Sequence, residues 1–186
     1  MSDTANIVRR LTPITIMLSV SLLLGSSWAA PSVFPENAAY FSAGYNGSLG
    51  VVAGGEYVVE TPFVDTSVDA ALYADLNAAF GARLSGTALV FPAIGTEPPL
   101  ALGLGADIDV NNGGAGFHIG PVLGSDLLFV FDLPMTVSTY IAPGYASDAG
   151  FDLAWALQVR YYFDTFALEL ASTDVLPLSV GLRYLF

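Results

Sequence analysis

From residue 39 to the C-terminus, apolar residues recur at every second position, with small or polar residues between them. The clearest stretch is 151–163. Its odd positions are Phe151, Leu153, Trp155, Leu157, Val159, Tyr161 and Phe163, and its even positions are Asp152, Ala154, Ala156, Gln158, Arg160 and Tyr162. A period of two predicts strands that have one bulky apolar face and one small or polar face. The mature chain has no comparable 3.6-residue period that would predict a helix.

The apolar face keeps its phase across three expected hairpin turns. A two-residue loop leaves the residues on either side of it on the same face of the sheet. The expected pairs are Phe163 with Phe166 across 164–165, Val110 with Ala115 across 111–114, and Phe131 with Met135 across 132–134. The preserved phase predicts that consecutive strands are antiparallel neighbours.

Seven strands follow directly from this pattern, and two regions leave the total open. The seven strands are 66–76, 79–91, 99–110, 135–145, 150–163, 166–172 and 178–186. Region 40–60 contains a possible turn at 46–48, and region 115–131 contains one at 124–126, so the count is nine, ten or eleven. Bacterial single-chain barrels have even strand numbers. We therefore expect ten strands, with eight as the alternative.

The first thirty residues have the features of a secretory signal peptide. Arg9 and Arg10 precede an apolar stretch from 11 to 24, and Ser27 and Ala29 fit the small-residue rule for cleavage. We place the cut after Ala29, or alternatively after Ala30, and an uncleaved anchor helix is the other interpretation. The expected organisation is a signal peptide at 1–29, a periplasmic N-terminal segment at 30–38 and a barrel at 39–186.

Composition and charge narrow the class of protein. The chain is 54% hydrophobic and 12% charged, which leaves too few charges to cover a water-facing surface. Beyond residue 30 it nevertheless contains no apolar run of the roughly 20 residues that a membrane-spanning helix needs. The mature chain keeps three arginines against sixteen acidic residues, which excludes nucleic acid as a partner. The absence of cysteine excludes a disulfide framework.

Alternation alone fits two inverted architectures. A soluble barrel of the lipocalin kind would enclose the bulky face, whereas a membrane barrel would turn it toward lipid. The polar faces lack the lysines and glutamates that protect soluble sheets from edge pairing. The other face is rich in Gly, Ala and Ser, which suits a narrow lumen, and aromatic residues gather near strand ends, as in a membrane-boundary girdle. We therefore predict an all-β fold, a closed antiparallel up-and-down transmembrane β-barrel.

The last strand carries the most specific feature of the sequence. Leu178, Val180, Leu182, Tyr184 and Phe186 alternate up to a terminal phenylalanine. This pattern resembles the C-terminal signal of small bacterial outer-membrane β-barrel proteins, and the mature chain resembles the outer-membrane-protein-A-like or PagP-like size class. The resemblance implies that the barrel-assembly machinery reads Leu182, Tyr184 and Phe186 as an assembly signal. An ordinary edge strand that ends in phenylalanine is the alternative.

With the apolar face outward, all three mature arginines and several acids fall on the inner face. These candidates are Arg83, Arg160 and Arg183, with Asp69, Asp75, Asp107, Asp109, Asp152 and Glu169. An unpaired charge in a tight lumen is costly, so we expect Arg–carboxylate pairs that fill the lumen. Because six acids exceed three arginines, an acidic passage that selects small cations is the alternative.

Catalytic and metal sites find little support in the sequence. His118 is the single histidine, expected on the inner face near Asp107 and Asp109, and these three residues lack the spacing of a metal site. The residues after His118 lack the serine of outer-membrane lipid A deacylases, and Ser125-Asp126 is the only trace of the palmitoyltransferase set. We expect a hydrogen-bonded lumen histidine, with no catalytic residue, metal or cofactor.

These observations together predict a non-enzymatic outer-membrane protein with a structural or envelope-stabilising role. Such a protein can also serve as an accessory subunit of a larger envelope complex. A narrow cation-permeable pore is the alternative function, and an outer-membrane lipid-modifying enzyme is the third. The expected partners are the lipid bilayer of the outer membrane and the barrel-assembly machinery.

Overall fold

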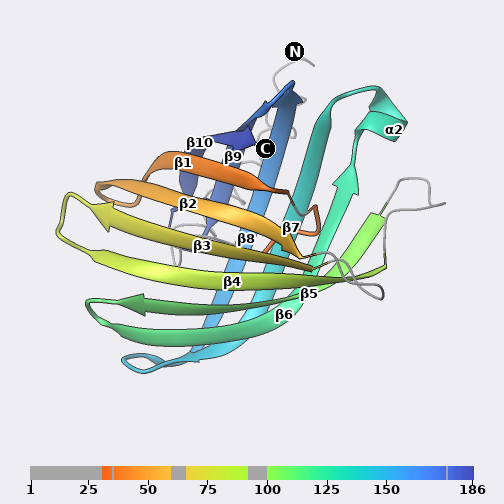
Figure 1. Ribbon diagram of the computed structural model, residues 1–186. Helices are drawn as coiled ribbons and strands as arrows, with labels where there is room; N and C mark the ends of the chain where they lie inside the picture. Colours follow the sequence, from red (N-terminus) through yellow and green to blue (C-terminus); the bar gives the residue numbers. More distant parts are fainter. Residues whose placement is uncertain (1–30, 35, 60–65, 92–99, 175) are drawn as a thin grey trace, which may run out of the picture.

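The chain folds as a closed β-barrel (Figure 1). The computed structural model describes residues 31–34, 36–59, 66–91, 100–174 and 176–186, and the expected signal peptide lies outside these residues. Within them, ten antiparallel strands follow one another around the barrel in chain order, and β1 closes the wall against β10. The predicted ten-strand barrel is confirmed, and the eight-strand alternative is wrong. No described helix is long and apolar enough to cross a membrane.

The strands are 8 to 14 residues long, with one short helical turn between β6 and β7. Their bounds are β1 Ala38–Tyr45, β2 Leu49–Val59, β3 Thr66–Asp75, β4 Phe80–Phe91, β5 Leu100–Asn111, β6 Gly114–Asp126, α2 Leu128–Phe131, β7 Met135–Ala146, β8 Gly150–Phe163, β9 Phe166–Thr173 and β10 Leu178–Leu185. The first strand thus begins one residue before the predicted start of the barrel at 39.

The turns decide between the alternatives that the sequence left open. The chain reverses at 46–48, where Gly47 has a φ of +71° that favours glycine. The expected pairs Phe163–Phe166 and Val110–Ala115 are present.

The expected pair Phe131–Met135 is wrong, and no turn occurs at 124–126. β6 runs on to Asp126, which lies opposite Thr136 of β7. The Asp126 carboxylate then accepts a hydrogen bond from the Leu128 N–H at 2.9 Å, and the chain forms α2 instead of a hairpin. A side-chain acceptor at this point competes with strand pairing, which the alternation of apolar residues does not reveal.

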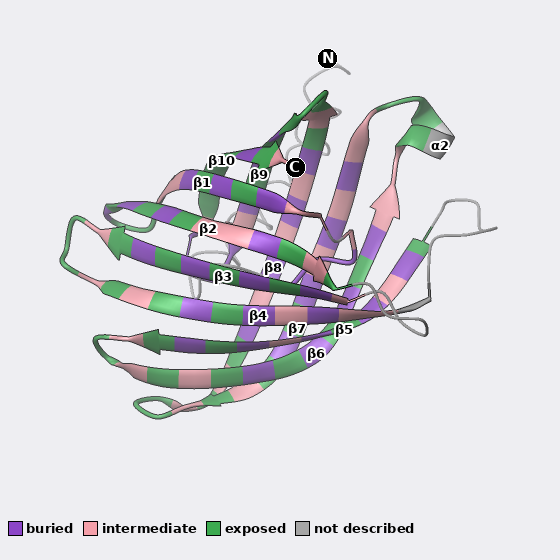
Figure 2. Cartoon of the chain, in the orientation of Figure 1, coloured by how far each residue is buried: buried purple, intermediate pink, exposed green. Residues whose placement is uncertain are grey.

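The bulky face of every strand points out of the barrel, as Figure 2 shows by the alternation of exposed and buried residues. Leu72 is 67% exposed and Ile141 is 52% exposed, whereas their inward neighbours Ala71 and Ala142 are buried. Large apolar side chains exposed on all sides of a molecule are stable in lipid and not in water. The lipocalin-like alternative is therefore wrong, and the chain is a transmembrane barrel.

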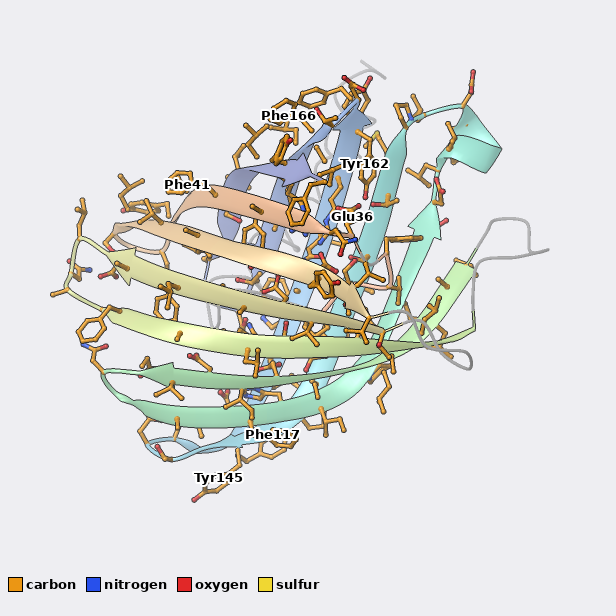
Figure 3. All side chains as sticks on the ribbon, in the orientation of Figure 1. Glu36, Phe41, Phe117, Tyr145, Tyr162 and Phe166 are labelled. Carbon is orange, nitrogen blue, oxygen red and sulfur yellow. The ribbon has the colours of Figure 1, made fainter. Side chains whose placement is uncertain are left out.

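Aromatic side chains mark both ends of the apolar band. We name the ends by the chain: the terminal end, where β1 begins and β10 finishes, and the hairpin end, where β1 turns into β2. At the terminal end Tyr161, Phe163, Phe166, Tyr184 and Phe186 form a row with ring centroids 5.5–6.4 Å apart. In Figure 3, Phe117 and Tyr145 lie at the opposite end of the barrel from Phe166. Such girdles sit at the two membrane–water boundaries of outer-membrane-type barrels.

Lipid contact predicts a depth-dependent cost of placing a charge on the outer face. Leu170 lies in the middle of β9 and Leu178 begins β10 at the hairpin end, and both are exposed. We expect Leu170→Arg to lower the free energy of unfolding by about 2–4 kcal/mol, and Leu178→Arg by about 0–1 kcal/mol. Urea unfolding in lipid vesicles, followed by tryptophan fluorescence, measures both values. Equally small losses at the two positions would contradict contact with lipid.

Candidate functional site

The inner face of the barrel is lined with small residues and with charged side chains that pair inside the lumen. Arg83 on β4, Arg160 on β8 and Arg183 on β10 all point inward and are 3% exposed. Their strands place them in two groups. Arg160 and Arg183 lie toward the terminal end, and Arg83 lies toward the hairpin end.

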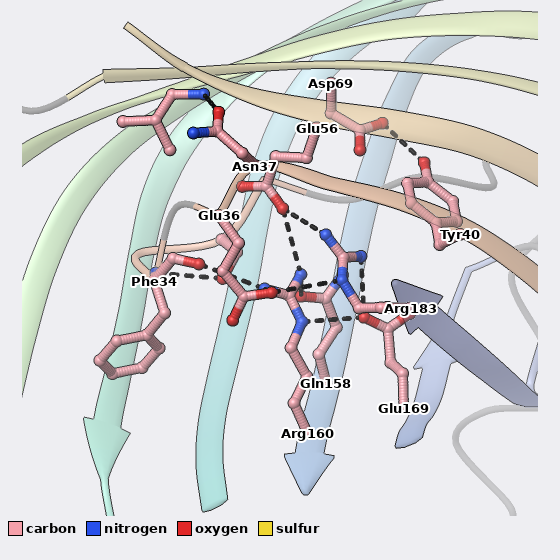
Figure 4. A network of polar contacts seen from close by, with 12 residues as sticks. Phe34, Glu36, Asn37, Tyr40, Glu56, Asp69, Gln158, Arg160, Glu169 and Arg183 are labelled. Carbon is pink, nitrogen blue, oxygen red and sulfur yellow. Dashed lines mark hydrogen bonds and ion pairs between the residues drawn. The ribbon is translucent and has the colours of Figure 1, made fainter. Parts of the chain in front are cut away.

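The group at the terminal end joins two arginines to three glutamates, as Figure 4 shows. Arg160 Nε donates to Glu169 Oε2 at 2.9 Å, and Arg183 Nη1 donates to the same oxygen at 3.3 Å. Arg183 Nη2 donates to Glu56 Oε2 at 2.5 Å. Glu36 Oε2 lies farther away, 3.6 Å from Arg160 Nη1 and 3.5 Å from Arg183 Nε. We call these five residues the arginine network.

Further polar groups surround the arginine network. The Tyr40 hydroxyl donates to Asp69 Oδ1 at 2.8 Å, and the Arg183 guanidinium lies 4.8 Å from the centre of the Tyr40 ring. The Tyr162 hydroxyl donates to Glu36 Oε1. The sequence placed Asp69 among the ion-pair candidates. In the described part of the chain its carboxylate instead accepts a hydrogen bond from a tyrosine.

The group at the hairpin end is centred on Asp107. Its Oδ2 lies 2.6 Å from Arg83 Nη2 and accepts a hydrogen bond from the Tyr140 hydroxyl at 2.8 Å. Its Oδ1 lies 3.0 Å from His118 Nδ1, and His118 Nε2 lies 3.4 Å from Asp152 Oδ2. The structure therefore brings together Arg83, Asp107, His118 and Asp152 on the inner face. We call this set with Tyr140 the aspartate network.

Two predicted acids lie beside these networks rather than within them. Asp109 accepts a long hydrogen bond from the Tyr73 hydroxyl at 3.5 Å. Asp75 ends β3 and accepts hydrogen bonds from Ser48 Oγ and from the N–H groups of Asn77 and Ala79, each at 2.9 Å. For Asp75 the prediction of a lumen ion pair is wrong, because its carboxylate holds the hairpin together.

The chain before β1 enters the lumen at the terminal end. Val33 is 2% exposed and packs with Ala101, Val122 and Tyr140 from the inner faces of three strands. The Phe34 carbonyl accepts a hydrogen bond from Arg160 Nη1 at 3.2 Å. Full burial of a valine side chain stabilises a fold by about 1.5–3 kcal/mol. We refer to the described residues 31–34 and 36 as the N-terminal segment.

Residues 30–38 were expected to form a periplasmic segment apart from the barrel, whereas the N-terminal segment packs against the inner face of the wall. Glycines on β5 and β6 make room for it: a Cβ on Gly105 would lie 2.7 Å from Pro31, and one on Gly124 would collide with Val33. Both the packing of Val33 and the hydrogen bond from Arg160 to the Phe34 carbonyl favour a position of the segment inside the barrel. That the terminal end of the barrel faces the periplasm stays a prediction.

At the hairpin end, the connection between β9 and β10 also turns inward. Leu176 is 3% exposed and packs against Tyr40, Val52 and Tyr73. Its N–H is held by Thr173 Oγ1 at 3.0 Å, and its carbonyl accepts from the Thr173 N–H at 2.9 Å. The lumen is therefore narrowed from both ends.

A small cavity lies between the two ends of the lumen. Its water-accessible volume is about 20 Å³, room for about one water molecule. Polar side chains of Tyr40, Asp69, Gln158, Glu169 and Arg183 contribute to its lining. In the described part of the chain no three His, Asp or Glu side chains form a group that could hold a metal ion. The described side chains therefore fill most of this part of the lumen.

Sequence reasoning missed two of the acids in the arginine network. Glu56 has the same inward phase as Val52 and Gly54 on β2, but region 40–60 was not among the assigned strands, and its acid was not considered for the lumen. Glu36 was assigned to the periplasmic segment, and no period of two extends that far. The tyrosines that donate hydrogen bonds to these acids could not be predicted from the sequence. A tyrosine is compatible with either face of a strand, so the alternation does not show that it points inward.

The expected assembly signal lies on the outer face. Leu182, Tyr184 and Phe186 are 47%, 49% and 69% exposed, and Tyr184 and Phe186 belong to the aromatic row of the terminal end. Their recognition by the assembly machinery stays a prediction.

Comparison with known proteins adds a likeness of fold. No family model and no curated protein matches the chain. Among solved structures it is similar to "KdgM porin" and to "KdgM porin in complex with disordered oligogalacturonate", with a TM-score of 0.52 and 8% identity in each case. The fold is that of a porin-like outer-membrane barrel. Each match covers 80% of this chain and 99% of the porin.

The arginine network predicts unequal costs for two substitutions. Arg183→Met would leave Arg160 among three carboxylates, and we expect a loss of about 3–5 kcal/mol in the free energy of unfolding. Glu36→Gln would leave two arginines with two glutamates, and we expect a loss below about 1 kcal/mol. Urea unfolding in lipid vesicles tests both, with Arg183→Lys as the control that keeps the charge. A loss of similar size for Arg183→Met and Glu36→Gln would contradict the charge balance described here.

Proposed function

We propose that this protein is a narrow outer-membrane pore that favours small cations over anions. The observation that carries the proposal is the excess of carboxylates on the inner face. Eight acids face the lumen or its mouths against three arginines and one histidine; the acids are Glu36, Glu56, Asp69, Asp107, Asp109, Asp152, Glu169 and Asp174. A lumen with net negative charge concentrates cations and repels anions.

The likeness to a porin barrel supports a pore over a purely structural role. The sequence favoured the structural role because paired charges were expected to fill the lumen. Pairs are present, but they leave acids in excess, and the one solute named for a similar structure is the oligogalacturonate bound to KdgM porin. For this chain the acidic lumen disfavours such a polyanion and favours cations.

An enzymatic role has less support. His118 holds Asp107 and Asp152 with its two ring nitrogens, and Asp107 in turn contacts Arg83 and Tyr140. Each member of the aspartate network is thus engaged by another, which suits a structural brace. The similar structures are porins.

Ion selectivity tests the proposal. In planar lipid bilayers with a KCl gradient, we expect a reversal potential of the sign that K⁺ permeation gives. The Asp152 side chain is 26% exposed and lies at the hairpin end of the lumen. Asp152→Asn should lower the cation-to-anion permeability ratio about two- to fivefold, since one charge near a solvated path contributes about 0.5–1 kcal/mol.

A matched charge removal outside the lumen provides the control. Asp164 lies in the exposed turn between β8 and β9 with a φ of +58°, which asparagine tolerates. Asp164→Asn should leave the permeability ratio unchanged. Anion selectivity of the unmodified protein, or no conductance under any condition, would reject the proposed pore.

A further inference from the structure

We propose that the N-terminal segment is a displaceable plug that opens and closes the pore. This inference rests on the proposed pore function and adds its regulation. The segment is the one described stretch at the terminal end that fills the lumen without belonging to the barrel wall or to a connection between strands. Three features of the structure carry the inference: a shaped seat in the wall, a weak ionic hold and a firm anchor at the base.

The seat is built into the wall by glycines. A Cβ on Gly105 would lie 2.7 Å from Pro31, and one on Gly103 would lie 3.2 Å from Val33. Gly124 leaves no room for any side chain between itself and Val33. All three glycines face inward on β5 and β6. The wall therefore lacks side chains where the segment lies. Close packing within the wall also limits these positions, because a Cβ on Gly103 would lie 3.0 Å from the Ala88 carbonyl oxygen and one on Gly124 would lie 2.9 Å from that of Val137.

The ionic hold on the segment is the weakest in the arginine network. Glu56 and Glu169 approach Arg183 and Arg160 to 2.5 and 2.9 Å, whereas Glu36 approaches the same arginines to no less than 3.5 Å. Because Glu56 and Glu169 belong to the wall, they already balance the two arginines. Departure of Glu36 leaves two positive and two negative charges, so no buried charge loses its only partner.

The base of the segment stays fixed to the barrel. The Asn37 side-chain oxygen accepts a hydrogen bond from the Val58 N–H at 2.9 Å, and the Asn37 carbonyl accepts from the Phe186 N–H at 3.0 Å. These bonds tie the chain to β2 and to the C-terminus directly before β1 begins. Movement of the segment therefore pivots at Asn37 and leaves the strand pairing of β1 intact.

A disulfide lock tests the plug. The chain contains no cysteine, so two introduced thiols have no competing partner. The 3.2 Å between a Cβ on Gly103 and Val33 Cγ1 is close to the about 3 Å that separates Cβ of one half-cystine from Sγ of the other. We expect the oxidised V33C/G103C protein to be non-conducting in planar bilayers. Reduction should restore the conductance at least tenfold.

The outcomes separate the plug from the pore. The single variants V33C and G103C, treated with the same oxidant and reductant, should conduct equally in both states. Equal conductance of the oxidised and reduced double variant would overturn the plug and leave the pore standing. Absence of conductance in the unmodified protein as well would reject both, because the plug rests on the pore.

Thiol reactivity provides a second readout that does not need conductance. V33C and A154C both replace residues that are at most 2% exposed, but Ala154 belongs to β8 of the wall. In the folded, membrane-extracted protein, a water-soluble maleimide should modify V33C at least tenfold faster than A154C. Equal, slow modification of the two thiols would show that the segment does not leave its seat.

Discussion

Lipid offers no hydrogen-bond partner to the peptide backbone, and this constraint determines the architecture. Every N–H and C=O in the membrane must be satisfied within the sheet, so the sheet has to close. The closure is made by β1 and β10, which pair from Ala38 with Leu185 to Tyr45 with Leu178. A closed wall separates lipid on the outside from the lumen on the inside. The period of two along each strand follows from this separation, because bulky apolar residues face lipid and small or polar residues face the lumen.

The same closure makes the inner face a place where charges must neutralise each other. Arg183 on β10 contacts Glu56 on β2, and the two strands are separated by β1. Arg83 on β4 contacts Asp107 on the neighbouring β5. Such contacts link nearby strands on the inner face of the wall, and their strength depends on exclusion of bulk water. Acids that exceed the arginines give the lumen its negative sign.

The period of two was sufficient to predict the strands, their outward faces and the inward placement of all three arginines. It failed where a side chain acts on the backbone: Asp126 starts α2 and Asp75 holds a hairpin. It also could not reveal Glu36, because the N-terminal segment is not a strand and its position depends on the cavity that the wall leaves. Pairing partners across the lumen depend on barrel shear, which no local pattern contains.

The glycines on β5 and β6 explain why a chain segment, rather than side chains of the wall, fills this part of the lumen. A Cβ on Gly105 or Gly124 would meet the segment at Pro31 or Val33, and it would also meet the wall at Val122 or at the Val137 carbonyl. With glycine there, the lumen is filled by a chain segment held by valine packing and by a carboxylate that the arginines do not need. Two hydrogen bonds add to this hold, one from Tyr162 to Glu36 and one from Arg160 to the Phe34 carbonyl. A permanent plug would gain stability from contacts as short as those of Glu56 and Glu169. The looser contacts of Glu36 leave the wall complete without the segment, which is the condition for a closure that can reverse.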